Sequence, residues 1–203
     1  MPAPLPRLVI ATHNAHKTGE FREMLGARWL VEDLTAHAGL IPPEETGATF
    51  EENAAIKSLA ASAFLGPEVL VVADDSGLEV DALDGRPGVR SARYAGGGDE
   101  ANRDKVLAEL EAAGIHGTAR TGRFRCVLSV ARAGVELAVF RGAVEGVIAD
   151  GVRGAGGFGY DPVFIPDGHC ATFGELPASV KNGISHRSRA LSVLVHWLER
   201  PRR

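Results

Sequence analysis

Residues 69–80, VLVVADDSGLEV, decide the fold that we predict for this chain of 203 residues. The run at 69–73 is continuously apolar, which is typical of a central strand buried on both faces. Asp74 and Asp75 follow it, and two carboxylates after a buried strand are costly unless they are paired or bind a metal ion. If the strand continues through both aspartates, they point to opposite faces, so that only one faces a given cleft and the scaffold must satisfy the other. The alternative is an ordinary strand-end turn with Asp and Gly.

Further strands and helices are predicted on both sides of this strand. Short apolar runs predict strands at 7–12, 78–83, 123–132 and 135–149, the last two joined by a turn at Ala133-Gly134. Helical spacing of apolar residues predicts helices over 17–25, 99–113 and 187–199. The sequence therefore predicts an α/β fold with mixed strand directions.

One more helix has the clearest boundaries. Thr49 and Glu52 fit a capping box, and Gly66-Pro67 ends the helix. Asn53 and Lys57 lie four residues apart on one polar face, which either meets solvent or lines a phosphate site. The opposite, apolar face is predicted to consist of Ile56, Leu59, Ala60, Ala63 and Phe64.

The composition is ordinary for a globular protein, with 45% hydrophobic and 24% charged residues. A formal net charge of −4 argues against a nucleic-acid-binding protein, which would carry a basic face. Cys126 and Cys170 have neither CxxC nor metal-ligand spacing, so we expect two reduced thiols rather than a disulfide. No apolar run suits a signal peptide or a membrane helix. We therefore expect a cytoplasmic protein without nucleic-acid or membrane partners.

Two segments near the predicted strand ends carry charged groups. Residues 11–17, ATHNAHK, lie between a strand and a helix, where backbone N–H groups and Lys17 form a ready site for phosphate. The helix dipole opposes a lysine in the first turn, which a nearby anion would explain. The loop is not a Walker A sequence, and an ordinary surface loop is the alternative. Glu44 and Glu45 precede the capped helix, where acidic residues are commonly no more than partners of the helix dipole.

Two later motifs suit a nucleobase. Residues 154–162, GAGGFGYDP, surround Phe158 and Tyr160 with glycine, as expected where a backbone approaches a ligand closely, and an aromatic ring there would stack on a base. A flexible hairpin tip is the alternative for this loop.

The second motif, KNGISHRSR, gathers Lys181, His186, Arg187 and Arg189 at the start of the last predicted helix. Arg offers only hydrogen-bond donors, which match the 6-oxo group of hypoxanthine or xanthine and not the 6-amino group of adenine. A solvated basic helix start is the alternative.

Together these motifs resemble the inosine triphosphate pyrophosphatase family, also called the XTP/dITP diphosphatases. The resemblance spans residues 8–198 and is carried, in the family's order, by ATHNAHK, TGATFEENAAIK, ADDSGLEVDALDGRPGVRSARYAG, GGFGYDPVF and KNGISHRSRAL. It implies a single domain over residues 1–203, in which two lobes share a long mixed β-sheet flanked by helices, with a central cleft. It also implies a homodimer, Mg²⁺ as the cofactor, and hydrolysis of ITP, dITP and XTP to the monophosphate and pyrophosphate.

The resemblance further implies roles for individual residues. Asp75 corresponds to the proton acceptor and metal-linked carboxylate of the family, with Glu44 or Glu45 as a second metal-associated acid. His13 departs from the glycine or other small residue of many relatives. Asn53 and Lys57 are expected to support the site. The implied substrate-binding residues are Thr12, His13, Asn14, Ala15, His16, Lys17, Ser76, Phe158, Gly159, Tyr160, Asp161, Lys181, His186 and Arg187.

The mechanism that we hypothesise is attack of a water molecule on the α-phosphorus. Asp75 aligns this water, while Lys17, with Lys57, neutralises the leaving pyrophosphate. Arg187 selects the 6-oxo group, because a buried donor that faces the amino group of adenine goes unpaired. The alternatives are a pyrophosphatase for modified pyrimidine nucleotides and a nucleotide-sensing module without turnover.

Overall fold

The computed structural model describes residues 5–200, which form two compact units. Unit 1 contains residues 5–75, 126–141 and 188–200, and unit 2 contains residues 76–125 and 142–187. Three long strands contribute residues to both units. Strands and helices are interspersed along the chain, so the predicted α/β class is confirmed.

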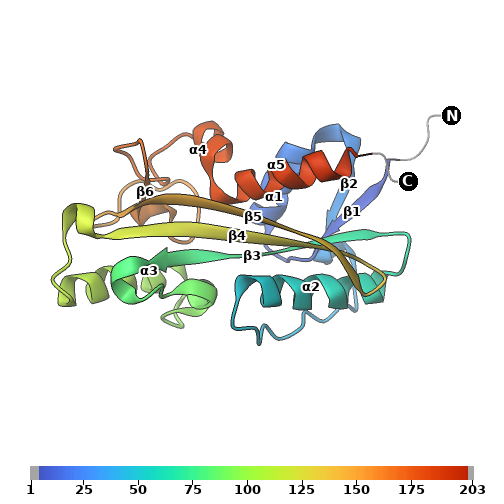
Figure 1. Ribbon diagram of the computed structural model, residues 1–203, viewed down its shortest axis with the longest axis horizontal. Coiled ribbons are helices and arrows are strands. Elements are labelled where there is room, and N and C mark those ends of the chain that lie inside the picture. Colours follow the sequence, from blue (N-terminus) through green and yellow to red (C-terminus); the bar gives the residue numbers. More distant parts are fainter. Residues whose placement is uncertain (1–4, 201–203) are drawn as a thin grey trace. The chain divides into compact units, whose positions relative to one another are not determined.

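A six-stranded sheet has the order β2-β1-β3-β4-β5-β6 (Figure 1). β1 pairs in parallel with β2 and with β3, whereas β6 pairs antiparallel with β5. The prediction of mixed strand directions is therefore confirmed. The strands are β1 (Arg7–Ile10), β2 (Leu30–Asp33), β3 (Leu70–Val80), β4 (Thr121–Arg132), β5 (Val135–Ile148) and β6 (Phe164–Pro166).

Five α-helices accompany the sheet in the described residues: α1 (Ala15–Leu25), α2 (Phe50–Leu65), α3 (Gly98–Ala112), α4 (Ala178–Ile184) and α5 (His186–Leu198). The four predicted helices are confirmed within about two residues at each end. The motif at 181–189 does not simply open the last helix, because the extended backbone of Ser185 separates α4 from α5. Among residues 5–200, no helix has both the length and the apolar character that are needed to cross a membrane.

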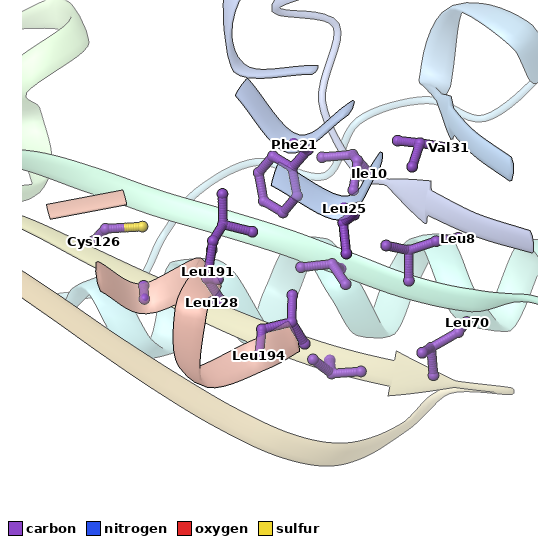
Figure 2. Close-up of a cluster of buried hydrophobic side chains, with 13 residues drawn as sticks. Leu8, Ile10, Phe21, Leu25, Val31, Leu70, Cys126, Leu128, Leu191 and Leu194 are labelled. Atoms are coloured by element: carbon purple, nitrogen blue, oxygen red, sulfur yellow. The ribbon is translucent and has the colours of Figure 1, made fainter. Parts of the chain in front are cut away.

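The strands of unit 1 are covered on both faces, because alternate residues point to opposite sides. In Figure 1, α1 and α5 lie on one side of these strands and α2 lies on the other. On the first side, shown in Figure 2, Leu8, Ile10 and Leu70 of the strands pack with Phe21 and Leu25 of α1 and Leu191 and Leu194 of α5. On the second side, Val9, Val71 and Ala73 pack with Ala61 of α2. Neighbouring residues of a strand therefore contact helices on opposite faces of the sheet.

Two predictions about the strands have opposite outcomes in the structure. β3 continues from Leu70 to Val80 through both aspartates, so the separate strand predicted at 78–83 is wrong, and a 3₁₀ turn follows at Asp81–Leu83. The predicted hairpin between β4 and β5 is confirmed. Its two turn residues, Ala133 and Gly134, have φ values of 50° and 76°. Positive φ at both positions is the property of the type I′ turn that suits twisted strands.

Helix α2 buries a different face from the one predicted. The capping box of Thr49 and Glu52 is confirmed. However, Phe64 is 56% exposed and Ala60 and Ala63 are also exposed. The buried residues are Phe50, Asn53, Ala54, Ser58, Ala61 and Ser62. The prediction was wrong because apolar character was taken as the sign of burial, whereas this helix buries mostly its smallest side chains.

Hydrogen bonds make the polar face of α2 compatible with burial. The Ser58 hydroxyl lies 2.7 Å from that of Ser129 on β4, and Ser129 donates to Glu136 on β5. The Ser62 hydroxyl accepts a hydrogen bond from the backbone of Gly134 at 3.0 Å. Small hydroxyl side chains thus fasten α2 to the β4–β5 hairpin, and their polar atoms are satisfied.

The core of unit 2 is formed by the unit 2 portions of β3, β4 and β5 together with α3, β6 and nearby loops. It contains Leu78, Val80, Val106, Leu110, Phe124, Ile148, Phe164 and Phe173, among others. Neither cysteine forms a disulfide: Cys126 is buried in unit 1 and Cys170 is exposed in unit 2. The expectation of two thiols rather than a disulfide is therefore confirmed.

We predict that Ser58→Leu lowers the free energy of unfolding by about 2–3 kcal/mol, because a larger side chain must be forced into a fully buried position and the contact with Ser129 is lost. The measurement is equilibrium denaturation in urea. Ala60→Leu is the matched control, since Ala60 is exposed on the same helix. Equal stability of the two variants would contradict the assigned helix face.

Candidate functional site

The alternation of β3 sends two consecutive carboxylates to opposite faces of the sheet in unit 1, and each meets a lysine. Asp74 pairs with Lys17 of α1 at 2.8 Å between Oδ1 and Nζ. Asp75 pairs with Lys57 of α2, also at 2.8 Å between Oδ1 and Nζ. Both aspartates are buried. Each carboxylate is thus neutralised by the helix that covers its face.

Lys57 also binds a second acid. Its ammonium group lies 2.8 Å from Oε1 of Glu45 as well as 2.8 Å from Asp75. Asn53, one turn earlier on α2, points its amide nitrogen at the other oxygen of Asp75 at 3.4 Å. The polar face of α2 therefore serves the aspartates of β3. We call Lys17, Glu45, Lys57, Asp74 and Asp75 the acid–lysine cluster.

Burial and charge act in opposite directions within this cluster. Burial raises the pKa of Asp75, and the charges of Glu45 and Asp74 add to this effect, although Lys57 lowers it. Burial lowers the pKa of Lys57, but Asp75 and Asp74 together with hydrogen bonds outweigh that effect and leave it above the ordinary value. Lys57 is therefore charged, and Asp75 holds a proton more readily than an ordinary aspartate. This property suits a group that must accept a proton.

A pocket of about 210 Å³ opens beside the cluster within unit 1. Its polar wall contains Thr12, His13, Lys17, Glu45, Lys57 and Asp74, and its apolar wall contains Leu34, Leu40, Pro42 and Pro43. Asp75 is not among the residues that line it, but it contacts Lys57, which is. The pocket also separates the two neighbouring glutamates, since Glu45 lines it while Glu44 is exposed and faces elsewhere.

The charges of the acid–lysine cluster fit a divalent cation. In their ionised forms, three carboxylates face two ammonium groups, which leaves one negative charge uncompensated. A polyanion would be repelled by such a wall unless a cation accompanied it. Mg²⁺ commonly takes one or two protein carboxylates and completes its shell with phosphates and water. Within residues 5–200, no three His, Cys, Asp or Glu side chains are placed so that they could hold a metal ion together. A Mg²⁺ ion that shares its ligands among protein, phosphates and water does not require three protein ligands.

The loop before α1 uses most of its own backbone donors. The Asn14 side chain caps α1 by accepting from the amides of His16 and Lys17, and the amide of Thr18 donates to the carbonyl of Asn14. The Thr12 hydroxyl accepts from the amide of Asn14 at 3.1 Å. An anion here would therefore meet side chains, above all Lys17, rather than a free helix N-terminus. The anion that the position of Lys17 predicted is present in the structure as Asp74.

Unit 2 holds a second group of predicted residues, which we call the aromatic–basic cluster: Phe158, Asp161, Lys181, His186 and Arg187. Asp161 Oδ2 accepts from Lys181 Nζ at 2.7 Å and from the backbone of Phe158 at 2.8 Å. The Lys181 ammonium lies 4.8 Å and the Arg187 guanidinium carbon 5.6 Å from the centre of the Phe158 ring. Both distances are within the range of cation–π contacts.

Most members of this cluster are buried. Lys181, His186 and Arg187 are each less than 7% exposed, so the alternative of a solvated basic helix start is wrong. Arg187 donates to the Ser76 hydroxyl at 2.9 Å, and the His186 ring stacks on Phe124 with centroids 4.8 Å apart. Burial of these side chains is compatible with their polarity because they have partners, among them Asp161 for Lys181 and Ser76 for Arg187.

The two aromatic residues of the glycine-rich loop have different positions. Tyr160 is buried and its hydroxyl donates to the carbonyl of Ser91 at 2.9 Å, and burial raises its pKa. Phe158 is only half-buried, so it is the ring that a base could reach. The loop is not a flexible hairpin tip, because a Cβ at Gly157 would lie 2.1 Å from the Asp161 carboxylate. Close packing likewise leaves no room for a Cβ at Gly154, whereas Gly159 has open space and is instead at a positive φ of 58°.

Part of the candidate site was not predicted from the sequence. Asp74 was expected only to be satisfied by the scaffold, yet Asp74 lines the pocket and Asp75 does not. The apolar wall from Leu34 to Pro43 was also missed, since these residues lie in segments without a recognisable motif. The alternation of β3 together with a lysine on each covering helix was the available signal for Asp74.

Sequence comparison finds close relatives over nearly the whole chain. The dITP/XTP pyrophosphatase of Bacillus subtilis is 49% identical over 194 residues, which cover 94% of this chain and 96% of the relative. The dITP/XTP pyrophosphatase of Halalkalibacterium halodurans is 48% identical over 195 residues, which cover 94% of this chain and 98% of the relative. The match therefore includes both clusters.

Solved structures show the same fold. The Ham1 protein of Staphylococcus aureus superposes with a TM-score of 0.83 at 43% identity, covering 95% of this chain and 98% of that one. A HAM1 protein from Coxiella burnetii also gives 0.83, at 38% identity, with 96% and 98% covered. The sequence model of the Ham1 family matches residues 8–197. With this match and these relatives, the chain belongs to the Ham1 family.

Proposed function

We propose that the chain hydrolyses the non-standard purine nucleoside triphosphates ITP, dITP and XTP to the monophosphate and pyrophosphate. The observation that carries the proposal is the whole-length identity of nearly one half with relatives named dITP/XTP pyrophosphatase. Removal of such nucleotides would cleanse the nucleotide pool. We further propose that the chain works in the cytoplasm, as one catalytic domain over residues 1–203.

The acid–lysine cluster is proposed to act at the triphosphate. Water attacks the α-phosphorus, its proton passes to an oxygen of Asp75, and the bond from the α-phosphorus to the bridging oxygen breaks. Lys17 and Lys57 then neutralise the leaving pyrophosphate. The raised pKa of Asp75 and the charged state of Lys57 support these roles. Thr12, His13, Asn14, Ala15 and His16 complete the proposed phosphate loop, and Asn53 orients Asp75.

Glu45 and Asp75 are the residues proposed to hold Mg²⁺. When bound, the ion would neutralise charge on the triphosphate. The uncompensated negative charge of the acid–lysine cluster supports this assignment. Lys57, which contacts both carboxylates at 2.8 Å, would keep the two acids close to each other. Glu45 is preferred to Glu44 because it lines the pocket and Glu44 does not.

The aromatic–basic cluster is proposed to recognise the base. Phe158 stacks on the purine, and Lys181, His186 and Arg187 present hydrogen-bond donors to its oxo groups. Ser76, adjacent to Asp75 in β3, would contact the substrate beside Arg187. Gly159, Tyr160 and Asp161 are proposed to act through the backbone and the position of Phe158, since both side chains among them are buried.

We also propose that the chain forms a homodimer. Its exposed large hydrophobic side chains support this, because all of those described except Val152 belong to unit 1: Leu5, Leu30, Ile41, Phe64, Val135, Leu137 and Val193. Burial of such side chains is the usual driving force for association of subunits. Sedimentation velocity would give a mass twice the 21.4 kDa of the chain.

The proposed reaction is tested by chromatography of the products formed from ITP, XTP, GTP and ATP, with and without Mg²⁺. We expect IMP and pyrophosphate from ITP, dependent on metal and much faster than turnover of GTP or ATP. IDP and phosphate would move the attack to another phosphorus. Absence of product from every purine would favour modified pyrimidine nucleotides, and no turnover of those either would favour a sensing module.

Asp75→Asn is expected to lower kcat for ITP by roughly 10³-fold or more, because the proton acceptor is lost. The matched variant is Asp74→Asn, because Asp74 pairs with Lys17 as Asp75 pairs with Lys57. We expect it to raise KM more than it lowers kcat, since Lys17 loses its fixed position. Circular dichroism checks that both variants fold. Near-normal turnover by a folded Asp75→Asn variant would overturn the assignment.

Glu45→Gln is expected to raise the Mg²⁺ concentration that gives half-maximal rate by roughly tenfold or more, as loss of a metal ligand does. Glu44→Gln removes the same charge one residue earlier and is expected to leave the Mg²⁺ dependence unchanged. The measurement is a titration of the rate with Mg²⁺ at saturating ITP. The opposite result would transfer the role to Glu44.

A further inference from the structure

The first two turns of α3 hold one residue of the glycine-rich loop at both its backbone groups. Asp99 Oδ2 accepts a hydrogen bond from the amide of Gly159 at 2.8 Å. Arg103 donates through one terminal nitrogen to the carbonyl of the same glycine, also at 2.8 Å. Asp99 and Arg103 are four residues apart, so they project from the same side of α3. All three residues belong to unit 2.

The geometry of Phe158 depends on this pair. Gly157 and Gly159, on either side of it, have φ values of 72° and 58°, which are left-handed conformations. The amide of Phe158 is held by Asp161, and the next amide along the chain is held by Asp99. Backbone hydrogen bonds therefore fix the chain before and after Phe158. These two contacts restrain the backbone from which the ring projects.

The surroundings of Arg103 indicate that this contact is specific. The side chain is half-buried, and its Nε has no hydrogen-bond partner among the described residues. The carbonyl of Gly159 is the acceptor that the guanidinium does find. A solvated arginine would satisfy all its donors with water. Arg103 is instead held against the loop.

We propose that Asp99 and Arg103 are positioning residues that set the place of the Phe158 ring, and thereby the ability of the chain to distinguish one purine base from another. They act through Gly159 and touch no substrate themselves. The inference rests on the proposed function, in which Phe158 stacks on the base beside Lys181 and Arg187. Neither residue belongs to the acid–lysine cluster, whose members are all in unit 1.

The test compares Asp99→Ala with Asp99→Asn, whose amide oxygen can still accept from Gly159, and Arg103→Ala with Arg103→Lys. Glu100→Ala is the control, because it removes the neighbouring acid from the same helix turn. Hydrogen–deuterium exchange of the peptide covering residues 154–161 reports the contact without catalysis. Steady-state kinetics with ITP and GTP report its effect on the base.

We expect faster exchange in both alanine variants. KM for ITP should rise about fivefold to tenfold, as for loss of one ordinary hydrogen bond, while kcat stays within about twofold. The preference for ITP over GTP, as a ratio of kcat/KM values, should fall in the same variants. Asp99→Asn and Arg103→Lys should restore most of the wild-type KM and exchange, and Glu100→Ala should match the wild type.

The inference is overturned if Asp99→Ala behaves like Glu100→Ala. It is also overturned if kcat and the melting temperature both fall while KM rises, because that combination indicates a structural role alone. Equal loss in Asp99→Ala and Asp99→Asn would also contradict it, because the hydrogen bond would not be the cause. If the wild type hydrolyses no purine nucleotide, the proposed function and the role in base selection fail together. The exchange measurement then still decides whether the pair holds the loop.

Discussion

The alternation of side chains along β3 is the constraint on which the site depends. A strand that is buried on both faces sends Asp74 and Asp75 in opposite directions, and neither carboxylate can reach bulk water freely. Each therefore requires a cation from the helix on its own side. This explains why Lys17 lies in the first turn of α1, against the helix dipole, and why α2 buries a polar face. The needs of two adjacent residues thus account for one lysine on each of the two helices.

A buried carboxylate organises unit 2 in a comparable way. Asp161 binds the Lys181 ammonium and the backbone of Phe158, so a single side chain fixes both a donor and an aromatic ring. Gly157 must lack a Cβ to allow this approach. The two clusters differ in their relation to the backbone. The acid–lysine cluster is built from strand and helix side chains, whereas the aromatic–basic cluster depends on a loop whose conformation is held by surrounding hydrogen bonds.

The sequence was sufficient for the elements with strong local signals and insufficient where tertiary contacts decide. The capping box at Thr49, the Ala133-Gly134 turn and most strands follow from local pattern, and the motifs identified the family. The buried face of α2 did not, because hydroxyls such as that of Ser58 are buried only when Ser129 is present to meet them. β2 and β6 are too short to show the alternation of apolar and polar residues by which a strand is predicted. Which of Glu44 and Glu45 lines the pocket depends on the direction of a side chain in a loop, which no local pattern indicates.

The different surroundings of the two thiols have a practical consequence. Cys126 lies in the core of unit 1 at 1% exposure, whereas Cys170 is on the surface of unit 2. Thiol reagents act on accessible thiolates, so a maleimide dye would attach at one position of the unmodified chain. The residue that carries the dye belongs to the same unit as the aromatic–basic cluster and contributes to neither cluster. The native chain thus carries its own handle for a fluorescent reporter of events in that unit.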